Sequence, residues 1–380
     1  MKLKLTDVQR LIIGRSLQAL GFWVPIALLY YRAQGLTDEQ AFTVIGALQL
    51  MLVLLEYPTG VIGDTYGHKV SVVLGYLFAG TATILLGSSL SIPLPMIYFY
   101  LFLFAVGGTL ISGSDVAMLH TISKDFKADM ANLGKTSGWF TTFGLIVGGL
   151  VATIDLRIPF LLSGIAMFIS AILISKVKVK HSNEDGDNVF TIAKLGMREA
   201  FFNLKIFIPV FFSAVFTMFL LSEKWVLPAI FEQSNIPLAF FGIVTAVVTI
   251  SRGQASGLYK KFKDVNYWIL ITLMLLSSVL ISFPYISLLG LALVYGFSAY
   301  IITQSDVAIN ENVDSRARAS IISFRNLLSR LFNSPYVFII GLASAELAFP
   351  QVNIVMSITV LIFVLIIWGI YRMRVKYSKV

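Results

Sequence analysis

The sequence contains no cysteine and three histidines, and charged residues make up 13% of its 380 positions. The missing cysteines exclude disulfide bonds, thiolate catalysis and cysteine-ligated metal sites. The three histidines, His68, His120 and His181, are scattered along the chain, so no histidine metal site within an apolar segment can be recognised. We therefore expect no bound metal, no cofactor and no enzyme active site.

Apolar side chains are in excess instead, because 57% of the residues are hydrophobic, against roughly 45–50% in ordinary soluble domains. Continuous apolar runs, close to the roughly 20 residues that cross a bilayer, recur along the chain. Their continuity excludes a closed β-barrel, whose strands alternate at every second residue. We predict an all-α membrane protein with twelve transmembrane helices, at 11–31, 40–61, 70–90, 95–118, 137–154, 158–176, 205–227, 238–257, 266–283, 286–308, 320–342 and 350–371.

Lysine and arginine gather on one set of alternate turns between the predicted helices, whereas the opposite set holds essentially Arg32, Arg157 and Lys224. Because basic residues favour the cytoplasmic ends of membrane helices, we expect both termini in the cytoplasm and the chain in the cytoplasmic membrane. The formal net charge of +9 then has a topological cause, and no nucleic-acid partner is expected. The first apolar run lacks a cleavage pattern after it, so we expect it to remain in the mature protein.

One long polar segment, at 177–203, divides the predicted helices into six at 1–176 and six at 204–380. The tetrapeptide Ser-Asp-Val-Ala occurs at 114–117 and again at 305–308, near the cytoplasmic ends of the fourth and tenth predicted helices. A motif repeated at equivalent positions of two halves indicates a duplicated unit. We predict two pseudo-symmetric six-helix bundles joined by a cytoplasmic loop.

A glycine-rich motif follows the second predicted helix, reading Gly-Val-Ile-Gly-Asp-Thr-Tyr-Gly-His-Lys at 60–69. This motif resembles the signature of the major facilitator superfamily of transporters, with His68 where members usually have Arg or Lys. The preceding Glu56-Tyr-Pro-Thr-Gly60 resembles one branch of the superfamily. Members of that branch often carry further acidic residues after the Ser-Asp of the fourth helix, and this chain lacks them.

In the family this motif forms a latch that holds the two halves together on the cytoplasmic side. The resemblance therefore implies latch roles for Gly60, Gly63, Asp64, Gly67, His68 and Lys69. Glycines permit the tight turn, and a carboxylate is favoured near a helix N-terminus. We expect Asp115 and Asp306 to support the latch by pairing with Lys69 and Arg252, each within its own half.

Ionisable side chains at membrane depth cost about 2.5–3.5 kcal/mol on insertion scales, so each suggests a function or a buried partner. Glu56 lies roughly 9 Å inside its predicted helix, at about 1.5 Å per residue, and Arg325 lies at a similar depth in the eleventh. Because the second and eleventh helices meet in the family, we predict a Glu56–Arg325 pair. Arg330, nearer the midplane, either has a function or forms a buried structural pair.

Other polar or aromatic residues of the predicted helices are weaker candidates. Arg15 either lines the cavity or extends its charge to the membrane surface. Glu223 and Lys224 are expected to form a solvated pair at the outer end of the seventh helix. The remaining candidates for the substrate cavity are Trp23, Tyr30, Gln49, Tyr295 and Tyr300.

The resemblance implies a secondary transporter that works by alternating access and needs a small-molecule substrate, the lipid bilayer and a coupling ion. Gly-Lys-Thr at 134–136 lacks the preceding strand of a phosphate-binding loop, so ATP is not the expected energy source. We expect proton coupling, because burial can tune a carboxylate such as Glu56 to titrate near neutrality.

Export of a small lipophilic or drug-like solute is our first interpretation, from the aromatic content of 13% and the similarity to small bacterial efflux proteins. The fifth predicted helix lacks the Gly-Pro that drug antiporters typically carry, reading Gly-Leu-Ile-Val-Gly-Gly at 144–149. Uptake symport and lipid flipping therefore stay open. A non-transporting sensor or scaffold would be expected to carry a long soluble appendage. We expect a monomer in a bacterial membrane.

Overall fold

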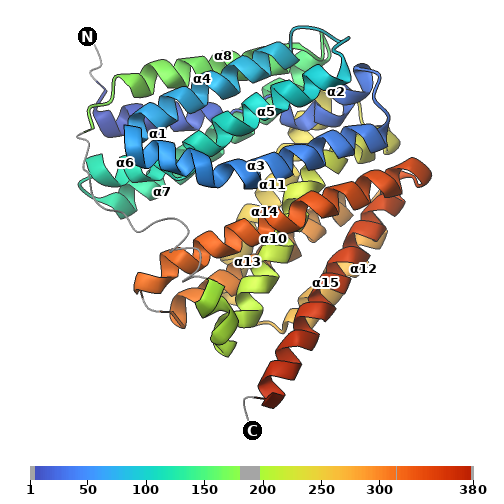
Figure 1. Cartoon of the computed structure of the whole chain (residues 1–380). Coiled ribbons are helices and arrows are strands. Elements are labelled where there is room, and N and C mark those ends of the chain that lie inside the picture. Colours follow the sequence, from blue (N-terminus) through green and yellow to red (C-terminus); the bar gives the residue numbers. More distant parts are fainter. Residues whose placement is uncertain (1–4, 180–196, 314, 378–380) are drawn as a thin grey trace. The chain divides into compact units, whose positions relative to one another are not determined.

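The structure is a computed structural model, and it describes residues 5–179, 197–313 and 315–377 (Figure 1). Every regular element in these ranges is a helix. The chain forms two compact units. Unit 1 comprises Met1–Leu36, Ala47–Gly186 and Pro237–Ile243, and unit 2 comprises Thr37–Gly46, Asp187–Ile236 and Val244–Val380. The predicted boundaries, with bundles at 1–176 and 204–380, stay a prediction.

The helices up to residue 175 are α1 (Asp7–Gln18), the 3-10 turn η1 (Val24–Ile26), α2 (Ala27–Ala33), α3 (Asp38–Tyr66), α4 (His68–Leu86), α5 (Leu94–Ile111), α6 (Ser114–Ile122), α7 (Phe126–Ala152) and α8 (Ile158–Ser175). From residue 204 onward they are α10 (Leu204–Gln233), α11 (Leu238–Lys261), α12 (Tyr267–Leu280), α13 (Ser287–Glu311), α14 (Ser315–Glu346) and α15 (Phe349–Tyr377). Of these, α3 begins in unit 2 and continues in unit 1, whereas α11 begins in unit 1 and continues in unit 2.

The predicted all-α membrane fold is confirmed. In the described part of the chain, nine helices are long and apolar enough to cross a membrane. The first predicted span is instead divided, because Gly21 has a positive φ of 47° and Pro25 lies at the start of η1. The fifth lies on the less apolar α7, and the ninth on α12, which has 14 residues. The count of twelve spans therefore stays a prediction.

Unit 1 has a continuous apolar core between α1, α4, α5, α6 and α8, formed by residues such as Leu11, Val72, Ile111 and Ile174. One of its close helix contacts joins α4 and α5. A Cβ added to Gly107 would lie 2.5 Å from the backbone nitrogen of Ala79, so this glycine lets the two backbones approach. The close packing fixes the ends of α4 and α5, from which the polar groups described below project.

Unit 2 is built around α10, which packs against α13, α14 and α15. Of the apolar window of α10, 78% is buried, against 28% for α15. The helix continues through Pro209 and Pro228, although prolines remove a backbone hydrogen-bond donor. An apolar helix surrounded by other helices has an interior position, so a polar side chain in the buried middle of α10 lies inside the protein.

Candidate functional site

In unit 1, Asp115 forms an ion pair with Arg15 of α1. The Nε of Arg15 donates to Oδ2 of Asp115, and its Nη1 donates to Oε1 of Gln18 at 2.7 Å. The hydroxyl of Tyr76 donates to the same Gln18 oxygen at 3.3 Å. Asp115 is 6% exposed, so its carboxylate is buried beside the guanidinium of Arg15. Sequence analysis paired Asp115 with Lys69 and missed Arg15 as its partner.

The predicted latch motif contacts the start of α6. A Cβ on Gly63 would lie 2.9 Å from Oγ of Ser114, and Nδ1 of His68 lies 3.4 Å from the same oxygen. Gly67 begins α4 with a φ of 92°, a conformation that favours glycine. The side chain of Asp64 lies outside the described residues. Gly60 and Lys69 lie on α3 and α4, and the latch role of the motif stays a prediction.

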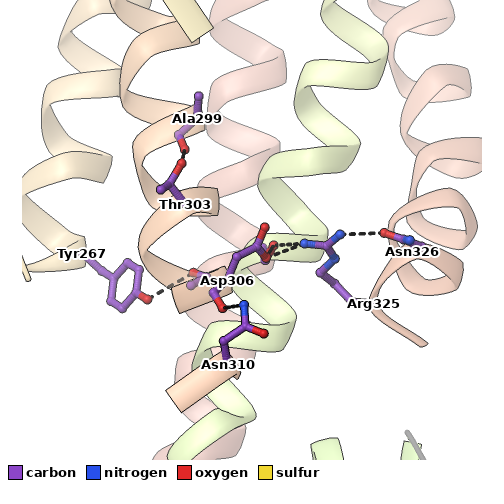
Figure 2. Close-up of polar contacts among 9 residues, drawn as sticks. Tyr267, Ala299, Thr303, Asp306, Asn310, Arg325 and Asn326 are labelled. Carbon is purple, nitrogen blue, oxygen red and sulfur yellow. Dashed lines mark hydrogen bonds and ion pairs between the residues drawn. The ribbon is translucent and has the colours of Figure 1, made fainter. Parts of the chain in front are cut away.

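In unit 2, Asp306 of α13 forms an ion pair with Arg325 of α14 (Figure 2). Nη1 of Arg325 donates to Oδ1 of Asp306 and also to Oγ of Ser213 at 3.2 Å. The other guanidinium arm, Nη2, donates to Oδ1 of Asn326 at 2.8 Å. The pair therefore ties together α10, α13 and α14, where sequence analysis had named Arg252 as the partner of Asp306.

The two copies of Ser-Asp-Val-Ala thus carry the same chemistry with differently placed arginines. The arginine that pairs with Asp115 lies on α1, whereas the arginine that pairs with Asp306 lies on α14, the helix after α13. Each ion pair lies within a single unit, Arg15–Asp115 in unit 1 and Arg325–Asp306 in unit 2. The repeat in the sequence predicted the two carboxylates but not the helices that supply their partners, because side-chain partners depend on packing.

Glu56 of α3 accepts a hydrogen bond from Oγ of Ser112 at 2.8 Å. Ser112 follows the last residue of α5, so this contact joins two helices of unit 1. Because Glu56 lies in unit 1 and Arg325 in unit 2, their predicted pair stays a prediction. Arg330 is half-buried on α14, and its role is likewise untested.

Three of the five cavity candidates have contacts within their own units, and the other two are buried. Trp23 stacks on Phe160 with ring centroids 6.0 Å apart, and Tyr30 contacts the same ring at 4.0 Å. Tyr300 donates to the backbone oxygen of Phe262. Gln49 and Tyr295 are buried, at 8% and 5% exposed. A role in a substrate cavity stays a prediction for all five.

The predicted solvated position of Glu223 at a helix end is wrong. The residue is fully buried, and its Oε1 accepts a hydrogen bond from Nδ2 of Asn353 of α15 at 2.7 Å. The predicted helix ends at 227, whereas α10 continues to Gln233. Glu223 therefore lies roughly 15 Å before the helix end, at about 1.5 Å per residue, and not at a solvated terminus. The apolar stretches at 218–221 and 225–231, on either side of Ser222-Glu223-Lys224, were the signal that could have shown this.

The sequence matches the family model of the Major Facilitator Superfamily over residues 11–335. The chain belongs to the major facilitator superfamily. An uncharacterised transporter of this superfamily from Methanocaldococcus jannaschii is 27% identical over 168 residues, which are 42% of this chain and 41% of that protein. The matched region thus spans about two fifths of that relative's length.

Solved structures of other facilitators resemble this one along nearly the whole chain. A mutant of the nucleoside transporter NupG has a TM-score of 0.77 at 12% identity, with 96% of this chain and 99% of that chain covered. A bacterial homologue of the human lysosomal transporter Spinster has a TM-score of 0.72 at 13% identity, with 97% and 96% covered. At such low identity, these likenesses show the facilitator fold alone.

The protein is thus a multi-pass membrane transporter of the facilitator type, as its loop motif indicated. The narrower resemblance, to the branch marked by Glu56-Tyr-Pro-Thr-Gly60, stays a prediction. The facilitator fold also gives the buried charges a setting, because ionisable groups within membrane helices commonly mark ion or substrate paths.

Proposed function

We propose that this facilitator is a secondary active transporter that works by alternating access and exports a small lipophilic solute in exchange for protons. The main support is that each unit pairs a carboxylate with an arginine of its own, through Arg15–Asp115 in one and Arg325–Asp306 in the other. Units with internal ion pairs can move as bodies without separating those charges. Rocking of two such bodies around a central site is how alternating access works.

An ion gradient is the energy source that fits this chain best. The Gly-Lys-Thr at 134–136 lies inside α7, so it does not form the strand-to-helix loop that binds ATP phosphates. Proton coupling requires a carboxylate that gains and loses its proton during the cycle. Glu56 is the candidate in unit 1, because it is a partly buried carboxylate within a membrane helix and its contact with Ser112, at 2.8 Å, is with a neutral hydroxyl.

The transport test uses inverted membrane vesicles in which respiration maintains a pH gradient. Lipophilic cations are added to vesicles with this protein and to matched vesicles without it. We expect the cations to dissipate the gradient only when the protein is present. No response to any cation would contradict the proposed export, and it would favour uptake symport or lipid flipping instead.

Glu56→Gln tests the coupling residue separately. The amide cannot exchange a proton, so we expect the variant to lose the cation-driven dissipation while it inserts into the membrane normally. Glu39→Gln is a matched control, because Glu39 lies in the first turn of the same helix. Unchanged dissipation in Glu56→Gln would exclude Glu56 as the coupling residue and leave export itself standing.

A further inference from the structure

Unit 2 contains a second carboxylate that the ion pairs described above do not use. Glu223 is fully buried in α10, the most enclosed helix of its unit. An ionised carboxylate in such a place is costly unless hydrogen bonds or a counter-charge compensate it. Each partner of Glu223 therefore bears on which protonation state the site holds.

A carboxylic acid and a side-chain amide can form a ring closed by two hydrogen bonds, and one of these two bonds joins Glu223 and Asn353. Nδ2 of Asn353 donates to Oε1 of Glu223 at 2.7 Å. Among the described residues, Oε2 of Glu223 and Oδ1 of Asn353 have no hydrogen-bond partner. Both are acceptors, so they cannot bond to each other unless one carries a proton. A single proton on Oε2 would supply the donor that these two atoms lack.

The groups around Glu223 are mostly neutral. Tyr295 of α13 and Tyr336 of α14 lie close enough to interact with its charge, and the hydroxyl of Tyr336 already donates to the backbone oxygen of Met356 at 3.0 Å. Asn353 is the contact from α15. The charged groups to consider are Lys224, next in sequence on α10, and Arg252 of α11, which interacts with Tyr295.

A second amide on α14 extends the polar cluster. Nδ2 of Asn333 donates to Oγ of Ser222 at 2.6 Å and to the backbone oxygen of Met218 at 3.0 Å. Its own Oδ1 has no partner among the described residues, and Asn333 is fully buried. Three helices thus direct polar side chains into the core of unit 2, where buried polar groups are normally satisfied.

We propose that Glu223 and Asn353 form a proton-binding site in the core of unit 2. In the loaded state the proton is bonded to Oε2 of Glu223 and donated to Oδ1 of Asn353, which closes the acid–amide ring. In the empty state the proton has passed to water and the carboxylate keeps the single bond from Nδ2. The change moves one unit of charge into or out of a core whose packing holds α10 against α15.

The inference rests on the proposed proton coupling for its place in transport, but not for the existence of the site. Infrared difference spectroscopy on the purified protein tests the site directly, through the carbonyl stretch of a protonated carboxylic acid. We expect this band at pH 7 in the wild type, its loss on raising the pH, and its absence from Glu223→Gln. Glu232→Gln is the control, because Glu232 is exposed on the same helix, and it should keep the band.

Stability separates a proton site from a structural anion. In Glu223→Gln the new amide can donate to Oδ1 of Asn353 and accept from its Nδ2, so we expect thermal unfolding at or above the wild-type temperature. A large loss of stability in Glu223→Gln would show that the ionised form is needed. A sodium-dependent rise in the unfolding temperature of the wild type, abolished by Glu223→Gln, would assign the site to a metal cation and overturn the proposal.

The vesicle assay tests whether the proton-binding site takes part in proton-coupled transport. If Glu223 carries the coupled proton, Glu223→Gln loses cation-driven dissipation of the pH gradient while Glu232→Gln keeps it. Dissipation in Glu223→Gln equal to the wild type would remove the site from coupling, with the proposed export intact. Failure of the wild type in vesicles would instead contradict the proposed function, and the infrared result would still decide whether Glu223 binds a proton.

Discussion

Asp115 and Asp306 occupy copies of one tetrapeptide, yet their surroundings differ. The side chain of Asp115 is 7% exposed and that of Asp306 is 40% exposed. Charge pairs gain importance with burial, because a stranded buried charge costs far more than a solvated one. Removal of the arginine should therefore cost more at Asp115 than at Asp306, because it is the aspartate that is left without its partner, even though the Arg15 side chain is 34% exposed and that of Arg325 is 14% exposed.

Arg15→Met tests the buried pair at the residue scale. The substitution leaves Asp115 buried without its cation, and we expect destabilisation approaching the roughly 3–5 kcal/mol seen when one partner of a buried pair is removed. Thermal unfolding in detergent measures it. Arg10→Met is the control on the same helix, because the Arg10–Asp7 pair is 29% and 31% exposed and should contribute at most about 1 kcal/mol. Equal effects of the two substitutions would contradict the account.

A pH prediction follows from Asp155, which lies between α7 and α8. Hydrogen bonds donated by the Arg157 side chain hold the pKa of Asp155 below its ordinary 3.8. A lowered folded-state pKa adds stability above the unfolded value, and this is lost as pH falls through the folded value. Wild type should therefore unfold at a slightly higher temperature than Asp155→Asn at pH 7. The difference should fade below pH 3.8, and a difference that grows on acidification would show the opposite sign.

At the scale of helices, apolar runs predicted where helices lie better than where they begin and end. The run at 40–61 lies on α3, which extends from Asp38 to Tyr66. The predicted run at 205–227 is shorter than α10, which extends from Leu204 to Gln233 and contains two prolines. Hydropathy reports transfer out of water, and it does not report which helix faces which. The sequence therefore predicted the carboxylates at 115 and 306, but not their arginine partners or the burial of Glu223.

Gly107→Ala tests the close contact between α4 and α5. The new Cβ would lie 2.5 Å from backbone atoms of Gly75 and Ala79, so the helices must separate. We expect a loss of about 1–3 kcal/mol in the free energy of unfolding, as for other overpacked cores. Gly138→Ala on α7 has open space around the added methyl group, and higher helix propensity should leave it neutral or more stable. A neutral Gly107→Ala would mean that α4 and α5 are not held this closely.

For the whole molecule, the loop motif at 60–69 was the most informative stretch of sequence, because it resembles one superfamily and the family model then matched residues 11–335. The division into two units could be predicted only coarsely. Parts of α3 and α11 belong to different units, and an apolar helix gives no sign in its sequence of where its packing partners change. Internal ion pairs in each unit remain the physical basis for treating the units as moving bodies.

Movement between the units is the central claim, and the absence of cysteine makes it directly measurable. Ala128 in unit 1 and Lys263 in unit 2 are both exposed. Spin labels on Ala128→Cys and Lys263→Cys would report the distance between the two labels by pulsed electron–electron double resonance. The account predicts at least two distance populations whose ratio changes with pH in the wild type, and the same measurement on Glu56→Gln and Glu223→Gln shows which carboxylate carries that change. A single distance that is independent of pH and of added lipophilic cation would contradict alternating access.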